Sequence, residues 1–231
     1  MKNKYIRSLH KLVNRLFYGR NDAFYIDLFV NGEMSSPTAL PSEKKRWEVL
    51  GRFIEEAVVR EHGDMLKILD LGCGRGWMSN LLAKYGEVVG CDPVSGVIEY
   101  AKELYPALTF HVGTHERMLQ QYGPGSMHLV VSSEVIEHIP LSDRRTYIEN
   151  IHAILGPRGF CIISTPRGEV EDNVPRGFDQ PVENWMTEQE VATLFSTGGF
   201  GAIRMERIKV GGTDLYQVWI FRKLGKAGQQ E

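Results

Sequence analysis

Residues 68–77 read Ile-Leu-Asp-Leu-Gly-Cys-Gly-Arg-Gly-Trp, and this stretch decides the fold. An apolar run ends at Asp70, and glycines at positions 72, 74 and 76 then lead into a helical pattern. This order of residues predicts a strand, a tight turn and the start of a helix. We therefore expect backbone N–H groups of the turn to lie open to a ligand.

The side chains of this turn indicate which kind of ligand it receives. In a phosphate-binding G-x-G-x-x-G turn, the last glycine would fall on Trp77, whose ring is too bulky for close packing of helix and strand. Asp70 beside the turn would repel a pyrophosphate but attract a cation such as an amino acid ammonium. The stretch predicts a nucleotide-like cofactor without a phosphate chain and disfavours NAD.

The bulk composition is that of one globular α/β domain with additions. The chain has 231 residues, of which 42% are hydrophobic and 24% charged, with a net charge of −2. This charge implies no general attraction to nucleic acid, which we do not favour as a partner. Cys73, Cys91 and Cys161 form no C-x-x-C pair, which favours a reducing cytoplasmic location over disulfides or a zinc site.

After residue 63 the pattern alternates between short apolar strands and amphipathic helices. We expect helices at 77–84, 94–104, 144–155 and 187–196 and strands at 66–70, 87–91, 108–112, 127–132 and 160–164. Two further strands, 203–210 and 215–221, are joined by the hairpin signal Gly211-Gly212. The repeated units predict a mostly parallel sheet with helices on both faces, and the hairpin makes one edge antiparallel.

Residues 1–62 are expected to form an N-terminal helical extension or lid, before an α/β domain at 63–224 and a frayed tail at 225–231. Residues 2–20 carry six basic and no acidic residues, with apolar residues at helical spacing. Three roles fit this basic helix: packing on the domain, a homodimer contact, or contact with an anionic membrane surface. A second helix is expected over 43–60, segment 19–40 gives no assignment, and no run is long enough for a membrane span.

The carboxyl ends of the first four strands should share one pocket, because ligands of such sheets bind there. The second strand ends at Asp92-Pro93, 20 residues after Gly72, where a carboxylate can accept hydrogen bonds from both hydroxyls of a ribose. The third ends near Thr114, a place for an adenine edge, and the fourth ends near the reactive end of the cofactor. The predicted cofactor-binding residues are Asp70, Gly72, Cys73, Gly74, Trp77, Asp92, Pro93, Thr114, Ser133 and Glu134.

Three segments carry a resemblance to a known family: 69–76 (LDLGCGRG), 90–93 (GCDP) and 133–139 (SEVIEHI). With these segments the chain resembles the class I S-adenosylmethionine-dependent methyltransferases, closest to the ubiquinone-biosynthesis type of O-methyltransferase. The resemblance implies S-adenosylmethionine as cofactor and a Rossmann-like, seven-stranded α/β sheet of order 3-2-1-4-5-7-6 with strand 7 antiparallel. It also implies methyl transfer, for which we expect a small-molecule or glycan hydroxyl as acceptor. Thr114 departs from the acidic residue that often follows the glycine at the third strand end.

The segment after the fourth strand supplies the catalytic candidates. A hydroxyl acceptor needs a base near the methyl group, and His138 is the first candidate and Glu137 the second. The alternative role of this pair is to cap a helix or to bind across the pocket floor.

Two other functions remain as alternatives. Glu134-x-x-Glu137-His138 resembles the metal-binding core of small-RNA 2′-O-methyltransferases, but the later histidine of that family has no counterpart after His152. We therefore predict no metal and do not favour an RNA substrate, which stays an alternative. A non-catalytic methyltransferase-fold partner subunit is the second alternative, against which the intact Asp70 and Asp92 argue.

Acceptor specificity is expected from residues 1–60 and from the loop 166–186. This loop carries a mixture of groups that suits a polar, ring-shaped acceptor or, alternatively, an ordered cover packed on the domain: Arg167, Arg176, Phe178, Asp179, Gln180 and Trp185.

Overall fold

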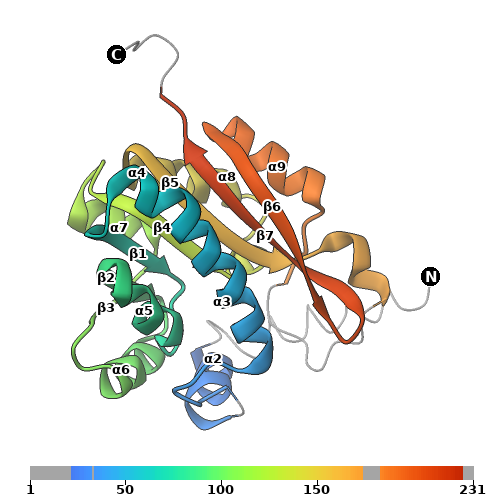
Figure 1. Cartoon of the computed structure of the whole chain (residues 1–231). Helices are drawn as coiled ribbons and strands as arrows, with labels where there is room; N and C mark the ends of the chain where they lie inside the picture. The colour runs from blue at the N-terminus through green and yellow to red at the C-terminus, as the bar shows by residue number, and fades with distance from the viewer. Residues whose placement is uncertain (1–21, 33, 174–182, 226–231) are drawn as a thin grey trace.

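The computed structural model describes residues 22–32, 34–173 and 183–225 of the chain. In it, one seven-stranded sheet has the order β3-β2-β1-β4-β5-β7-β6, with β7 antiparallel to its neighbours β5 and β6 (Figure 1). This confirms the sheet expected from the resemblance. The strands are β1 Leu66–Leu71, β2 Gly86–Asp92, β3 Thr109–Val112, β4 Met127–Ser133, β5 Leu155–Pro166, β6 Phe200–Val210 and β7 Thr213–Lys223.

Helices cover both faces of the sheet, as the alternating pattern predicts. The α-helices are α2 Asp22–Ile26, α3 Pro41–Phe53, α4 Arg60–His62, α5 Trp77–Leu82, α6 Ser95–Leu104, α7 His115–Tyr122, α8 Arg144–Ile154 and α9 Glu188–Thr197. Shorter 3₁₀ and π segments are η1 Asp27–Asn31, η2 Ile54–Val59, η3 Ala83–Tyr85, η4 Ile136–His138 and η5 Gly168–Asn173. Segments α3, η2 and α4 follow one another without a break, so the helix expected over 43–60 is confirmed with slightly wider bounds.

Two apolar clusters bury the two faces of the sheet. On one face, Leu50 and Phe53 of α3 and Leu82 of α5 pack with residues of the central strands. On the other face, Ile148 of α8 and Phe195 of α9 belong to a cluster that also takes in residues of α7. Burial of these apolar side chains holds the sheet rigid, so the loops at its carboxyl edge are fixed in position.

Helix α7 was not among the predicted elements. Of its eight residues only Met118 is fully buried, with Leu119 and Tyr122 packed partly against the core, so its apolar stripe is too short to stand out in the sequence. Strand β5 is also longer than expected and runs through Pro157 and Gly159, which are unfavourable in strand interiors. Its partner β4 shifts register between Met127 and Leu129, and this irregularity accommodates the extra residues.

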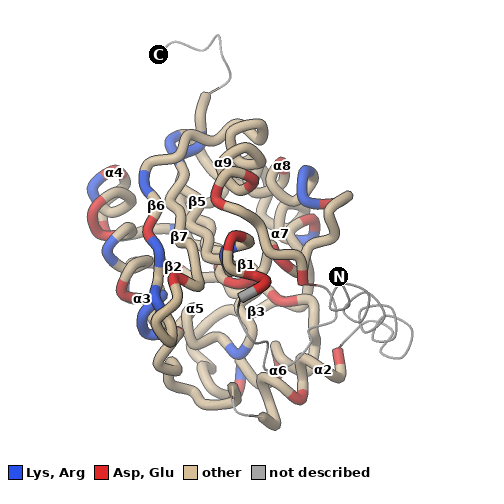
Figure 2. The backbone as a smooth tube through the Cα atoms, turned by 90° about the vertical axis from the view of Figure 1, so that its right-hand side faces the viewer, with Lys and Arg blue, Asp and Glu red and all other residues tan. Residues whose placement is uncertain are grey.

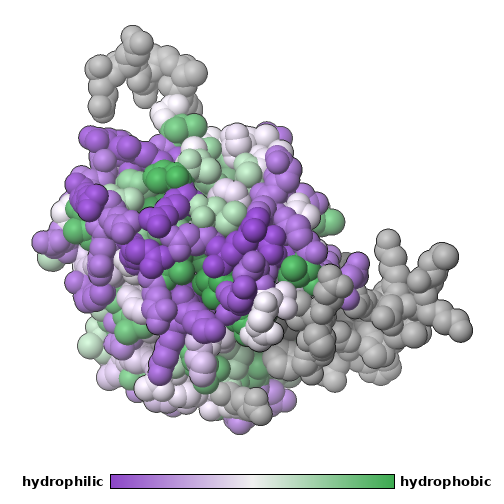
Figure 3. Space-filling view, turned by 45° about the vertical axis from the view of Figure 1, so that its right-hand side comes forward, coloured by the Kyte–Doolittle hydropathy of each residue, from purple (hydrophilic) through white to green (hydrophobic). Residues whose placement is uncertain are grey.

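The N-terminal extension is only partly described. The basic helix expected over residues 2–20 lies outside the described residues, as does most of the tail. In the described part, α2 packs against α6 near the lower end of the molecule in Figure 1. No helix of this part has the length and apolar character that a bilayer span requires. The face shown in Figure 3 is mostly hydrophilic, with small hydrophobic groups between the polar ones.

Candidate functional site

The glycine turn after β1 is tied to the end of β2. The backbone N–H groups of Gly72 and Cys73 donate to the carbonyl of Cys91 at 2.7 and 3.0 Å. Gly72 has a φ of 78°, and a Cβ there would lie 2.3 Å from Cγ2 of Val135. A larger residue is therefore excluded on both counts, because this conformation disfavours side chains and the neighbouring strand end fills the space.

Asp92 faces this turn from the end of β2. Its Oδ2 accepts a hydrogen bond from the Gly74 N–H at 3.2 Å, and its Oδ1 accepts one from the Val94 N–H at 3.0 Å. Burial raises the pKa of Asp92 to about 6, the two backbone hydrogen bonds oppose this, and Asp22 raises it further. Both oxygens are thus fixed in orientation and keep acceptor capacity for hydroxyl groups of a ligand.

Asp70 lies beneath the same turn and is 2% exposed. The Ser79 hydroxyl donates to its Oδ2 at 2.6 Å. Burial raises the pKa of Asp70 to about 7, and Asp92 adds to this rise. Figure 2 shows acidic positions gathered around β1 in the middle of the molecule. Two carboxyl groups that are costly to ionise together suit a ligand with positive charge.

A chain of hydroxyl groups joins the ends of β4 and β5. The hydroxyls of Ser133 and Ser164 lie 2.7 Å apart, and Ser164 donates to Oε1 of Glu134 at 2.8 Å. Thr165 donates to Oε2 of Glu137 at 3.0 Å. Glu134 also has a φ of 58°, which is unusual for a residue with a side chain and is often found at functional sites.

Glu134 and Glu137 form a second acidic group, separate from Asp70 and Asp92. Burial raises the pKa of each glutamate to about 7. The charges that act on Glu134 are those of Arg46, Glu137 and His138, so the structure groups it with the catalytic candidates. Its predicted contact with the cofactor stays a prediction.

His138 lies at the edge of this corner, where its side chain is 18% exposed. Its Nε2 is 3.9 Å from Oε1 of Glu137. On its other side, the Tyr25 ring of α2 approaches edge-on, with 6.3 Å between the ring centroids. The two catalytic candidates are thus neighbours, with Glu137 buried behind His138.

The segment α2–η1 covers the carboxyl edge of the sheet. Phe29 lies 3.6 Å from the position of a Cβ on Gly74, and Ile26 lies 2.9 Å from that of a Cβ on Gly96. Tyr25 reaches between the two acidic groups, because Asp92 and Glu137 both raise the pKa of its hydroxyl, after burial as the largest cause. The described part of the predicted lid is therefore in contact with the glycine turn and with His138.

The remaining predicted cofactor residues lie around the turn. Cys73 is buried at 5% exposure next to Gly74, and Pro93 follows Asp92 in the chain. Trp77 is 8% exposed and packs in the core as the first residue of α5. Thr114 precedes α7, and its hydroxyl donates to Glu116. Within the described residues, no three His, Cys, Asp or Glu side chains gather into a group that could hold a metal ion.

Arg75 supports the site, although the sequence analysis assigned it no role. It is fully buried, and its Nη1 and Nη2 donate to the two carboxylate oxygens of Glu43 at 2.9 and 2.6 Å. Its Nε donates to the Ser36 carbonyl at 2.6 Å. Arg75 thus fastens the N-terminal extension to the glycine turn, and an arginine inside an otherwise small-residue turn was the only signal for it.

The loop expected to hold the acceptor is described only at its two ends. Arg167 is 7% exposed, donates to Glu188 at 2.6 Å and to the Asp214 carbonyl at 2.9 Å, and so is engaged in the fold. Of the two alternatives for this loop, the structure thus favours for Arg167 the one in which the loop packs on the domain. The Trp185 indole donates to Glu183 at 2.6 Å. The other named loop residues, Arg176, Phe178, Asp179 and Gln180, lie outside the described part of the chain.

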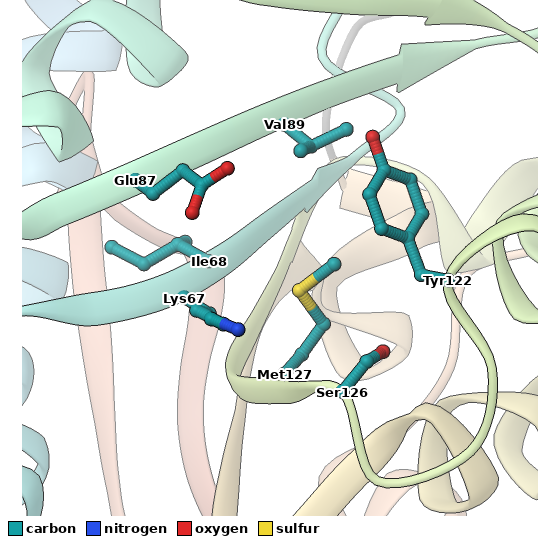
Figure 4. A pocket seen from close by; sticks show the side chains of 7 residues that line it. All are labelled: Lys67, Ile68, Glu87, Val89, Tyr122, Ser126 and Met127. Carbon is teal, nitrogen blue, oxygen red and sulfur yellow. The ribbon is translucent and has the colours of Figure 1, made fainter.

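A small cavity lies at the other edge of the sheet, away from this site (Figure 4). Its lining comes from the first halves of β1 and β2, the end of α7, the start of β4 and the loop before it: Lys67, Ile68, Glu87, Val89, Tyr122, Ser126 and Met127. Ligands of parallel sheets bind at the carboxyl ends, so we assign this cavity no part in the site.

Comparison with known proteins relates this chain to methyltransferases. Residues 68–159 match a family model described as a methyltransferase domain. The ubiquinone biosynthesis O-methyltransferase of Azorhizobium caulinodans is 30% identical over 127 residues, which cover 49% of this chain and 49% of that protein. The mitochondrial enzyme of the same name from Homo sapiens is 33% identical over 108 residues, 43% of this chain and 28% of that protein. The chain thus spans half or less of the length of these relatives.

Solved structures share the fold at low identity. A putative S-adenosylmethionine-dependent methyltransferase from Listeria monocytogenes has a TM-score of 0.62 at 16% identity, covering 79% of this chain and 99% of that one. The magnesium protoporphyrin IX methyltransferase from Synechocystis PCC 6803, solved with bound SAM, has a TM-score of 0.61 at 17% identity, covering 92% and 96%.

Proposed function

Because this chain belongs to the class I S-adenosylmethionine-dependent methyltransferases, we propose that it transfers a methyl group from S-adenosylmethionine to a hydroxyl of a small molecule or glycan. One observation carries the proposal: Asp92 and the glycine turn are hydrogen-bonded to each other across adjacent strand ends, with Asp70 buried beneath. A non-catalytic subunit would have no need of this arrangement.

The residues around the turn fit this cofactor. Asp92 would accept from the ribose hydroxyls with the lone pairs that its two backbone hydrogen bonds leave free. Asp70 would face the methionine ammonium, because a buried carboxyl with a raised pKa favours a nearby cation. Bound S-adenosylmethionine supplies a methyl group already activated on a sulfonium. The chain itself must align the acceptor and exclude water.

We assign proton removal from the acceptor hydroxyl to His138. The ring lies at the accessible edge of the corner, whereas Glu137 is 2% exposed and bonded to Thr165. When His138 takes up the proton it becomes positively charged, and the Glu137 carboxylate 3.9 Å away stabilises that charge. Tyr25 and Phe29 of the lid would then shield the reacting groups from water.

The names of the relatives favour a small-molecule acceptor, since one describes ubiquinone biosynthesis and another magnesium protoporphyrin IX. The proposed location is the cytoplasm. Cys73, Cys91 and Cys161 are free and buried, which fits a reducing compartment.

Calorimetric titration with S-adenosylmethionine tests the cofactor assignment. The wild-type protein is expected to bind it and not to bind NAD, and Asp92→Ala to lower the affinity by about 10²-fold. The loss follows because hydrogen bonds to a charged acceptor contribute about 1.5–3 kcal/mol each. Asp64→Ala, at an exposed position before β1, is the matched control and should leave the affinity unchanged. Absence of S-adenosylmethionine binding to the wild type would contradict the proposed function.

Cofactor binding is also expected to depend on pH and to release protons. In the free protein the pKa values of Asp92 and Asp70 are raised to about 6 and about 7, so both groups are partly protonated near pH 6. A positively charged ligand favours their ionised forms, so affinity should rise between pH 5.5 and 8 and then level off. Titrations in two buffers of different ionisation enthalpy measure the protons released. An affinity that stays constant over this range would refute the prediction.

Asp70 and Asp92 also make the stability of the free protein depend on pH. Folding raises their pKa values from 3.8, so the folded state binds protons more tightly than the unfolded state. Their contribution to the free energy of unfolding therefore falls as pH rises from about 4 to about 7. Saturating S-adenosylmethionine should weaken this trend, which denaturant titrations at several pH values can measure.

A further inference from the structure

Arg46 of α3 is a buried cation to which no role has been assigned so far. The residue is 5% exposed, and its guanidinium carbon lies 5.0 Å from the centroid of the Tyr216 ring on β7. Among the described residues no group accepts a hydrogen bond from its buried Nε. None of the described carboxylates lies close enough to form an ion pair with it either.

The position of Arg46 places it beside the catalytic candidates. Its charge lowers the pKa of Glu134 and Glu137, which places Arg46 near the corner formed by the ends of β4 and β5. Tyr216 pairs in register with Pro166, the last residue of β5 and the next after Thr165. Thr165 in turn holds Glu137. Arg46 therefore closes this corner from the side of the N-terminal extension.

An arginine in this state is costly to the fold. Arg46 has a side-chain hydrogen bond with the Tyr216 hydroxyl, but its buried Nε is left without an acceptor, which destabilises the folded state. Arg75 of the glycine turn, in contrast, is fully paired with Glu43 of the extension. The planar guanidinium fork fits a carboxylate or phosphate group with two parallel hydrogen bonds. The neighbouring Glu134 and Glu137, with pKa values raised to about 7, are partly neutral near pH 7 and so oppose a bound anion only in part.

We propose that Arg46 binds an oxyanion of the methyl acceptor, so that the acceptor is an acidic molecule whose hydroxyl is held beside His138. The inference rests on the proposed function and adds the chemical class of its substrate. Carboxylate and phosphate share the recognising chemistry, and the test separates them. Tyr216, under the guanidinium, would keep the fork in plane by its cation–π contact.

Thermal unfolding with three probes of similar size tests this inference: benzoate, phenyl phosphate and the uncharged benzamide. We expect benzoate or phenyl phosphate at saturating concentration to raise the Tm of the wild type by about 2–4 °C, and benzamide by less than about 1 °C. Arg46→Met should abolish the response to the acids. Arg46→Lys should keep part of it, because lysine retains the charge without the fork. The acid with the larger shift identifies the anion.

Arg52→Met is the matched control. Arg52 lies on the same helix but is half-exposed and paired with Glu206, so its loss should leave the response to the probes intact. Without any probe, Arg46→Met should be at least as stable as the wild type. Several degrees of lost Tm would instead show a structural counter-ion and overturn the proposal, as would a wild type that responds to neither acid. If S-adenosylmethionine still binds, those results refute this inference alone, whereas lack of such binding refutes the proposed function.

Discussion

Replacing His138 by alanine is expected to lower the turnover number for methyl transfer by about 10²–10⁴-fold, the usual contribution of a general base. The affinity for S-adenosylmethionine should stay the same, because Asp92 and the glycine turn are held by their own hydrogen bonds. Turnover is measured with labelled S-adenosylmethionine and the small-molecule fraction of a cell extract that the wild type methylates. Calorimetry gives the affinity for S-adenosylmethionine separately.

Two further variants, Glu137→Gln and His62→Ala, test the role of His138. Glu137→Gln keeps the hydrogen bond from Thr165 but removes the charge near His138, so it should reduce turnover less and shift its pH dependence. His62→Ala is the control, since His62 stacks on His128 at 4.9 Å and bonds to the carbonyl of Arg158, outside the site. Turnover that His138→Ala leaves undiminished would remove His138 as the base.

Replacing Arg75 by methionine is expected to lower the free energy of unfolding by about 3–5 kcal/mol, the usual cost of leaving one partner of a buried ion pair uncompensated. The side chains of Arg75 and Glu43 are 0% and 2% exposed, so water does not replace the lost contact. For a chain of this size the corresponding loss in Tm is about 10 °C. Denaturant unfolding monitored by circular dichroism measures the change in free energy.

We expect Arg75→Met to weaken cofactor binding as well as to lower the stability of the fold. Arg75 binds the Ser36 carbonyl, and Glu43 binds the Leu40 N–H at the start of α3 at 2.7 Å. Without these contacts the extension is held less firmly, so the affinity for S-adenosylmethionine should also fall. Arg145→Met is the control, because Arg145 is 84% exposed and its pair with Glu149 contributes less than about 1 kcal/mol. Equal losses in the two variants would contradict a special role for Arg75.

Much of the fold follows from local pattern. The strand before the glycine turn, the later alternation of strands and helices, and the hairpin at Gly211-Gly212 all appear where the pattern places them, because apolar periodicity and turn residues act over short distances. Helix α7 was not predicted because it is short and only three apolar residues, Met118, Leu119 and Tyr122, pack against the core. The strand order came from the resemblance and is the order that the structure has.

The sequence by itself determined that Asp70, the glycine turn and Asp92 meet at one edge of the sheet, because each comes at the end of a strand and parallel strands end together. Only the tertiary structure decided what closes that edge. Arg75 contacts Glu43, and the charge of Arg46 acts on Glu134, although the residues of each pair are more than 30 positions apart in the chain. Such contacts depend on burial and on where the N-terminal extension packs, and no local pattern carries that information. The glycine turn thus predicts the kind of cofactor, and the extension packed over it provides the candidate contacts for the acceptor.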